Sequence, residues 1–415
     1  MSDKKIQEKA FCSVSTQENN EKWQNCISRL KPLNKKPFEI RTEFERDTTR
    51  ILHSRAYRRL KHKTQVFFAT NNDHICTRIE HVNHVASISK TISNALGLNV
   101  SLAEAIALGH DLGHSPFGHH GERIIEKIME KEGFEGRFWH EKNSLRFVDF
   151  IETLPNYQGY SDNLYLTYAV RDGIVCHCGE VNENFLKPRD EFIDLQTIQK
   201  GKYQPYTYEG CVVKIADKIA YLGRDIEDAY RYRFFDKKDI LALKQIVQEA
   251  MRKKIKLKDV NTSSLIHEFI ITLCRNSNPT DGLVLSCEHY ELMNKIKKFN
   301  YEKIYHNPRF KPFMNYANLI LNTIFEYLLS HWAGYSTVNK LKKYSTFYPT
   351  LNHDFSGWLV KYSNIDPKAR QFKKLENIII YNIEDIQSYK QAITDYISGM
   401  SDTYAIKAYK ELIEF

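Results

Sequence analysis

No apolar run in this sequence is long enough to cross a membrane as a helix. The best candidate, residues 319–326, is interrupted by Asn322 and Glu326, whereas a span needs about 20 mostly apolar residues. The first five residues, MSDKK, open no apolar segment of the kind found in signal peptides. We therefore expect a cytoplasmic protein for which a membrane is not a partner.

Cysteine is sparse, and the eight cysteines are scattered along the chain. This spacing is not that of a disulfide-bonded secreted domain. The segment Cys176-His177-Cys178 raises the alternative of a zinc site, but no second Cys/His pair stands at zinc-finger spacing. Reduced thiols are the expectation, which agrees with a cytoplasmic location.

Patterns typical of strands are scarce, and no internal repeat is visible. Only residues 203–208 and 282–285 are strand candidates. Apolar residues instead recur at helical spacing from Phe44 onward. The clearest expected helices are residues 78–96, 102–112, 121–132, 212–230, 240–250, 264–273, 314–331 and 383–412. We expect an all-α fold with a helical core, a mainly helical C-terminal region and few short strands.

Two of these helices carry clear end signals. Gly97 follows the first and is expected to end it. Ser101 and Glu104 match a capping box for the second.

Composition divides the 415 residues into three expected parts. Residues 1–36 are polar and have few periodic apolar positions, so we expect a mobile or loosely docked arm. Residues 37–235 form the core, and residues 236–415 form a helical region packed on it.

The formal net charge is +9, which suits a polyanionic ligand such as a triphosphate or a nucleic acid. Part of the excess is local, at residues 30–36 and 251–258. A solvated basic face is the simpler explanation of such clusters.

The most informative stretch is residues 107–122, ALGHDLGHSPFGHHGE, where an adjacent His110 and Asp111 end an apolar helical run. His81 lies upstream and Asp217 downstream, both on apolar helices. Alone, His81 would more often be a hydrogen-bonded core histidine. Asp111 and Asp217 both continue inward-facing rows, and neither has Lys or Arg four residues away on its stripe. Because a bare buried carboxylate is costly, a shared divalent cation would satisfy both acids and hold both imidazoles.

Mixed nitrogen and oxygen ligands suit Mn²⁺, Fe²⁺, Zn²⁺, Ni²⁺ or, less well, Mg²⁺. Four protein ligands leave room for water and a phosphate oxygen if the ion is five- or six-coordinate. The expected chemistry is hydrolysis of a phosphate ester or anhydride. One ion is expected, because no dedicated second set of ligands is evident.

The turn after His110-Asp111 adds general acid/base candidates. His119 and Glu122, three residues apart, suit a base and the carboxylate that orients it. His114 lies close to them in sequence, whereas His120 is a candidate for a water-facing side chain. Spacing alone does not place His140 in the site.

Several segments together resemble the HD superfamily and, within it, the deoxynucleoside triphosphate triphosphohydrolases. They are residues 46–54, 57–67, 77–81, 110–122, 216–225 and 395–402, within a similarity that spans about residues 41–412. The H…HD…D pattern alone would indicate only an HD phosphohydrolase, but the combination is specific to the dNTP-hydrolysing branch. The resemblance implies an HD-type core.

The resemblance also implies residue roles. It makes His81, His110, Asp111 and Asp217 the metal ligands, and His119, Glu122, His114 and His140 the catalytic group. It implies that Arg78 and Lys218 hold phosphate oxygens, that Tyr221 packs under the deoxyribose, and that Gln65 and Asp225 bind the 3′-hydroxyl. Glu141 and Asn143 depart from the polar Asn and Gln expected after the histidine of the Phe-x-His segment.

The implied reaction is cleavage of a dNTP to deoxynucleoside and inorganic triphosphate. Two alternatives remain open: another HD phosphohydrolase, acting on a monophosphate, cyclic nucleotide or alarmone, and a single-stranded nucleic-acid-binding protein with a secondary HD site. Family members commonly form oligomers, often hexamers, and many bind a regulatory nucleotide. The sequence identifies neither a regulatory site nor a base preference.

Overall fold

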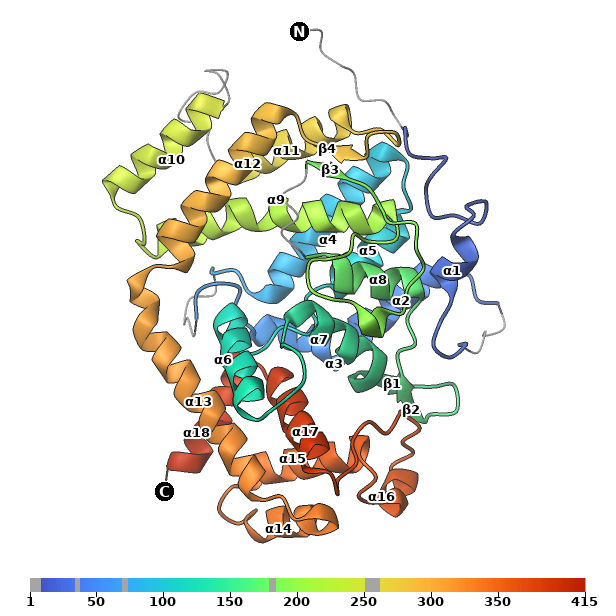
Figure 1. The fold of residues 1–415 in the computed structure, drawn as a ribbon, viewed down its shortest axis with the longest axis vertical. Helices are drawn as coiled ribbons and strands as arrows, with labels where there is room; N and C mark the ends of the chain where they lie inside the picture. The colour runs from blue at the N-terminus through green and yellow to red at the C-terminus, as the bar shows by residue number, and fades with distance from the viewer. Residues whose placement is uncertain (1–8, 34–37, 69–73, 179–183, 251–261, 415) are drawn as a thin grey trace.

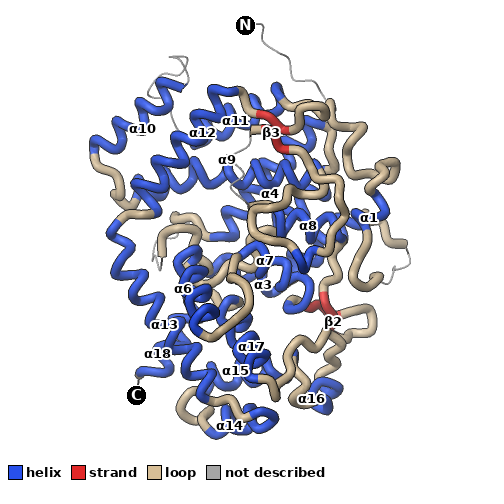
Figure 2. The backbone as a smooth tube through the Cα atoms, viewed as in Figure 1, coloured by secondary structure: helices blue, strands red, loops and turns tan. Residues whose placement is uncertain are grey.

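The computed structural model describes residues 9–33, 38–68, 74–178, 184–250 and 262–414, and the regular structure of this part of the chain is almost all helix, joined by long loops (Figure 2). The helices are α1 (Trp23–Ile27), α2 (Glu43–His53), α3 (Arg55–Arg59), α4 (Arg78–Leu96), α5 (Val100–Gly109), α6 (Gly118–Lys131), α7 (His140–Arg146), α8 (Tyr168–Cys176), α9 (Tyr208–Arg231), α10 (Lys237–Ala250), α11 (Thr262–Asn276), α12 (Cys287–Asn300), α13 (Lys311–Ser330), α14 (Thr337–Lys343), α15 (Pro349–Tyr362), α16 (Pro367–Phe372), α17 (Ile386–Ser398) and α18 (Asp402–Ile413). The expected all-α class is confirmed.

The strands in the described residues form two small antiparallel pairs. β1 (Thr153–Pro155) pairs with β2 (Ser161–Asn163), and β3 (Phe185–Leu186) pairs with β4 (Leu283–Val284). The prediction of a strand within residues 282–285 is confirmed by β4. The prediction at residues 203–208 is wrong, because this segment is irregular and leads into the first residue of α9.

The fold is organised around α5, an almost wholly apolar helix that packs against α2, α4, α8 and α9. α4 also packs directly on α9, so three long apolar faces meet at one place. In Figure 1, α13 runs down one side and connects the upper group of α10, α11 and α12 to the lower group of α14 to α18. One continuous apolar core extends from Phe11 through Ile106 to Tyr409.

The ends of the helices follow the expected signals in part. α4 has the expected bounds, and Gly97 ends it in the left-handed conformation with φ of 80°. The prediction of a Ser101–Glu104 capping box is wrong, because α5 begins earlier and Asn99 Oδ1 accepts from Leu102 N–H at 3.1 Å. The expected single helix at residues 383–412 is interrupted between α17 and α18.

The N-terminal segment is firmly packed where the structure describes it. Phe11 is fully buried, and the backbone N–H and hydroxyl of Thr16 donate to the buried carboxylate of Glu209 at 3.0 and 2.8 Å. Arg29 donates to the buried Asp47 at 2.5 Å. The expectation of a mobile or loosely docked arm is therefore wrong for residues 9–33.

The C-terminal region reaches the loop that follows α5. The Asp402 carboxylate accepts from Phe117 N–H at 2.9 Å and from Thr64 N–H at 3.1 Å. The buried Lys63 ammonium donates to the carbonyl of Ser398 at 3.3 Å and also to the carbonyl of His114. These contacts tie α17 and α18 to the loop between α5 and α6.

The structure can be compared with two expectations about partners, a membrane and a polyanion. No helix in the described ranges is long and apolar enough to span a bilayer. The basic cluster at residues 251–258, and residues 34–36 of the other, lie outside the described residues.

Candidate active site

The four predicted metal ligands come from three helices that meet in the core. His81 lies one turn into α4, His110 and Asp111 directly follow α5, and Asp217 lies in α9. His81 Nε2 is 3.0 Å from Asp217 Oδ1, and His110 Nε2 is 3.5 Å from Asp111 Oδ1 and 3.9 Å from Asp217 Oδ1. The structure thus brings all four together around His110 Nε2.

The donor set fits a divalent cation. His110 Nδ1 donates to the carbonyl of Ala107 at 2.6 Å, which leaves the lone pair on Nε2. That atom is buried and has no hydrogen-bond partner among the described residues. An unsatisfied imidazole nitrogen facing two carboxylates is the arrangement that a shared cation completes.

The backbone around His110 is held by α7. Ser144 Oγ donates to the carbonyl of His110 at 2.8 Å and accepts from Gly113 N–H at 2.9 Å. Asn143 Nδ2 donates to the carbonyl of Gly113 at 2.6 Å. A Cβ at Gly113 would stand 2.1 Å from the backbone nitrogen of Ser144, so this close approach requires glycine. Asn143, a departure from the family pattern, therefore supports the metal-ligand loop.

The sequence suggested that Asp111 has no Lys or Arg partner, and the structure corrects this. The buried Arg78 donates to Asp111 Oδ2 at 2.6 Å. Arg78 is 33 residues away in sequence and invisible to a search along one helical stripe. Its Nε and Nη2 are buried without a hydrogen-bond partner in the part of the chain that the structure describes.

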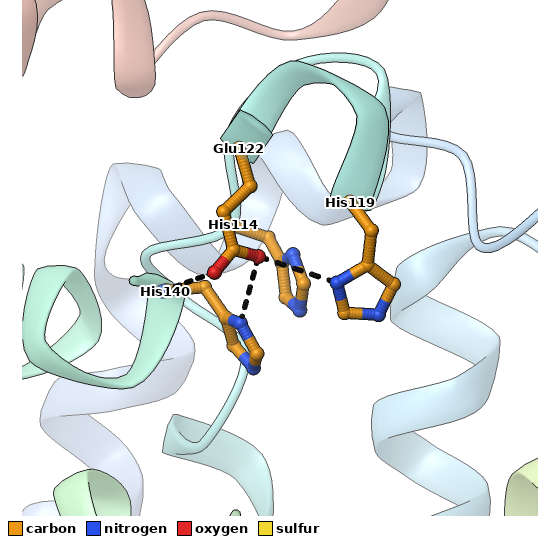
Figure 3. A group of neighbouring side chains, drawn as sticks. All are labelled: His114, His119, Glu122 and His140. Carbon is orange, nitrogen blue, oxygen red and sulfur yellow. Dashed lines mark hydrogen bonds and ion pairs between the residues drawn. The ribbon is translucent and has the colours of Figure 1, made fainter. Parts of the chain in front are cut away.

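A second group surrounds Glu122, as Figure 3 shows. The carboxylate faces His119 Nδ1 at 3.2 Å and His140 Nδ1 at 3.1 Å. The His119 side chain is 66% exposed, whereas His140 is buried and stacks on His114 with ring centroids 3.8 Å apart. His119 is thus the most exposed member of the group. The structure also places His140, which sequence spacing does not locate, in this group.

Neighbouring charges shift the pKa values of these side chains. Burial alone would favour neutral Glu122, but the charges of His140 and His119 and their hydrogen bonds hold its pKa well below the usual value. Burial opposes protonation of His140, yet Glu141 and Glu122 raise its pKa to about 9. Burial is likewise outweighed at Asp217, where His81 lowers the pKa to about 2. Glu122 is therefore anionic across the physiological range and able to orient His119.

A cavity of about 590 Å³ joins the two groups, which is large enough for a nucleotide. All five predicted substrate-binding residues line it: Gln65, Arg78, Lys218, Tyr221 and Asp225. Gln65 Oε1 is buried without a hydrogen-bond partner in the described ranges, so it is available to a ligand. Lys200, Lys297 and Tyr305, which sequence patterns did not identify, also line the cavity. So do His177 and Cys178, from the segment that raised the alternative of a zinc site.

Asp225 makes the free energy of unfolding depend on pH. Burial raises its pKa to about 7, although Tyr305 donates a hydrogen bond to it. A folded-state pKa above the unfolded value of 3.8 makes the free energy of unfolding fall as pH rises from about 4 to about 7, by roughly 1.4 kcal/mol per pH unit. In Asp225→Asn we expect this contribution to vanish. Urea unfolding at intervals across this pH range measures it, and parallel pH profiles for the two proteins would contradict it.

The comparisons agree with this arrangement. A family model for the HD domain matches residues 78–222, which contain all four predicted metal ligands. Curated relatives named deoxyguanosinetriphosphate triphosphohydrolase-like protein match nearly the whole chain. The relative from Caldanaerobacter subterraneus is 33% identical over 93% of this chain and 89% of its own. Those from Desulfatibacillum aliphaticivorans and Rickettsia felis are 31% and 32% identical over 91% of this chain and 89% and 93% of theirs. The chain therefore belongs to the deoxyguanosinetriphosphate triphosphohydrolase-like family of HD-domain phosphohydrolases.

Proposed function

We propose that the protein is a metal-dependent dNTP triphosphohydrolase, which cleaves a dNTP to deoxynucleoside and inorganic triphosphate. The observation that carries the proposal is the shared cavity, which is lined by three of the four candidate metal ligands, by the His119–Glu122 pair and by the five predicted substrate-binding residues. The fourth candidate ligand, His110, lies behind this wall, with its Nε2 3.5 Å from Asp111 Oδ1. The names of the relatives refer to the triphosphate of deoxyguanosine, which supports a dNTP as substrate.

His81, His110, Asp111 and Asp217 would hold one divalent ion, with Mn, Mg, Fe, Zn and Ni as the candidates. When bound, the ion supplies Lewis-acid stabilisation of charge on phosphate and lowers the pKa of water. Arg78, with Nε and Nη2 left for a ligand, and Lys218 hold the phosphate oxygens. Their positive charge stabilises the anionic transition state because they are already in place.

His119 transfers the proton in the proposed reaction. Water attacks the α-phosphorus, the bond from this phosphorus to the 5′-oxygen breaks, and the water oxygen stays on the triphosphate. The exposed His119 ring reaches the cavity and exchanges a proton with the water or with the departing 5′-oxygen. Glu122 fixes the orientation of the ring, and the stacked His140 and His114 hold Glu122 and the loop in position.

The sugar-binding residues would select deoxyribose. The Tyr221 ring packs under the sugar and leaves no space for a 2′-hydroxyl. Gln65 and Asp225 hydrogen-bond the 3′-hydroxyl, and a substrate without this group would leave buried polar atoms unpaired. Such a loss discriminates more strongly than the loss of an apolar contact.

Product-resolved turnover of the four dNTPs, singly and mixed, with Mg²⁺ or Mn²⁺, tests the proposal. We expect deoxynucleoside and intact triphosphate in equal amounts. Release of pyrophosphate or orthophosphate would contradict the proposed cleavage site. Turnover restricted to monophosphates, cyclic nucleotides or alarmones would favour the alternative HD phosphohydrolase. Salt-dependent DNA binding without any turnover would favour the nucleic-acid-binding alternative.

The assembly and further ligands are also proposals. We infer a homo-oligomer, with a hexamer as one form, because family members commonly assemble. A regulatory nucleotide and single-stranded DNA are the proposed additional partners, in keeping with the net charge of +9. Activity of mixed dNTPs that exceeds the sum of the single activities would reveal the regulatory nucleotide.

A further inference from the structure

His177, at the C-terminal end of α8, has the same hydrogen-bonding pattern as His110. It is 1% exposed, and its Nδ1 donates to the carbonyl of Ile174 at 2.7 Å. The lone pair therefore resides on Nε2, which is buried and has no hydrogen-bond partner among the described residues. None of the proposed catalytic roles uses this atom, yet its side chain lines the cavity.

Two further donors face His177. His140 Nε2 lies 3.8 Å from Cys178 Sγ, and donor atoms of His140, His177 and Cys178 all lie within 4.8 Å of one another. His140 Nδ1 stands 3.1 Å from Glu122 and 3.3 Å from Glu141. A carboxylate behind an imidazole orients the ring and raises its basicity, as is usual for metal-binding histidines. The raised pKa values of His140 and of the Cys178 thiol favour their protonated forms, so a bound cation displaces a proton from each of them.

The spacing and chemistry of these donors suit a thiophilic cation. With metal–nitrogen and metal–sulfur bonds of about 2.0 and 2.3 Å, tetrahedral ligand atoms stand roughly 3.5 Å apart. Imidazole and thiolate together favour Zn²⁺ or Fe²⁺ over Mg²⁺. Glu141 is buried, and its Oε2 lies 3.3 Å from His140 Nδ1, so its negative charge stands directly behind one of the proposed ligands.

We propose that His140, His177 and Cys178 form a second divalent-cation site, distinct from the site of His110 and Asp217, that binds Zn²⁺ or Fe²⁺. Three protein ligands leave a fourth position open to water or to a phosphate oxygen in the cavity. Cys178 is the distinguishing ligand. His177 also has its donor atom within 4.8 Å of those of His110 and Asp111, whereas Cys178 belongs only to the group with His140. The site does not depend on the identity of the substrate.

Metal analysis of the full-length protein tests the second site without an activity assay. The chain is loaded with Zn²⁺ or Co²⁺, desalted and analysed for metal per chain, and the Co²⁺ form is examined for thiolate-to-cobalt charge-transfer absorption. The variants are Cys178→Ala and His177→Ala, with Cys287→Ala as the control for an exposed cysteine. Asp217→Ala removes a ligand only of the first site, which is formed by His81, His110, Asp111 and Asp217.

We expect two ions per chain in the parent and in Cys287→Ala, and one in Cys178→Ala and in His177→Ala. The thiolate absorption should vanish in Cys178→Ala and persist in Asp217→Ala. Equal metal content in the parent and Cys178→Ala would overturn the proposal. The absence of thiolate-to-cobalt absorption in the parent protein would also overturn it. A third contradicting result would be that His177→Ala and Asp217→Ala each lose the same single ion while Cys178→Ala loses none.

Discussion

His119→Ala is expected to lower kcat by a factor between about 10² and 10⁴ while the bound metal and the fold remain. A positioned general acid or base contributes about this much, and His119 is the exposed imidazole that Glu122 orients toward the cavity. Because the side chain is 66% exposed, its removal leaves no buried void. Steady-state kinetics with dGTP, together with metal content and thermal unfolding of the same preparation, measure the effect.

The matched control is His53→Ala. His53 is an exposed histidine at the end of α2 and does not line the cavity. It should leave kcat within about a factor of two of the parent, since exposed substitutions away from a site rarely disturb stability. A His119→Ala protein that hydrolyses dGTP at the parental rate would remove His119 from the mechanism.

Asp217→Ala is expected to eliminate the ion bound by the first site and to reduce kcat/KM by at least about a thousandfold. The metal supplies several kcal/mol of transition-state stabilisation, and each 1.36 kcal/mol changes the rate tenfold. Asp217 is the carboxylate that contacts His81 at 3.0 Å and faces His110 Nε2 at 3.9 Å. Its loss leaves those two imidazoles without the charge that they share.

Glu227→Ala is the control on the same helix, because Glu227 pairs with Arg231 at 2.8 Å on the exposed side of α9. Metal content per chain and kcat/KM should match the parent there. If Asp217→Ala retained the full complement of ions and activity, the convergence of the four ligands would have no role in catalysis.

Features that depend on local sequence were the ones that could be predicted. The bounds of α4 follow from the apolar stripe through His81, Val85 and Ile88 and from the glycine at position 97. The start of α5 was predicted at Ser101 and is capped by Asn99 instead, and the pattern could not exclude this because both residue types are good caps. The interruption between α17 and α18 has a local signal that helical periodicity alone did not show, because Ser401 caps α18 by accepting from Tyr404 N–H. Ser398 and Asp402, on either side of it, also contact distant residues.

The site was predictable only as far as each residue could be assigned to an inward face or to a family motif. The Arg78–Asp111 ion pair and the His140–Glu122 contact join residues 33 and 18 positions apart, so they exist only in the folded chain. Cys176-His177-Cys178 did not match zinc-finger spacing, because its proposed partner is a single histidine on α7 rather than a second pair in sequence. Burial of an unpaired Nε2 is a property of the packed structure and has no sequence signature.

The contacts of Asp402 and Lys63 have a consequence for biosynthesis. The loop that carries His114 and Phe117 is secured by groups from residues 398 and 402, which leave the ribosome nearly 300 residues later. The nascent chain can therefore collapse around α4, α5 and α9 long before the catalytic loop acquires its final anchors. The loop would then reach its final position only after the last helix has been translated and docked, so a prematurely terminated polypeptide would lack these anchors.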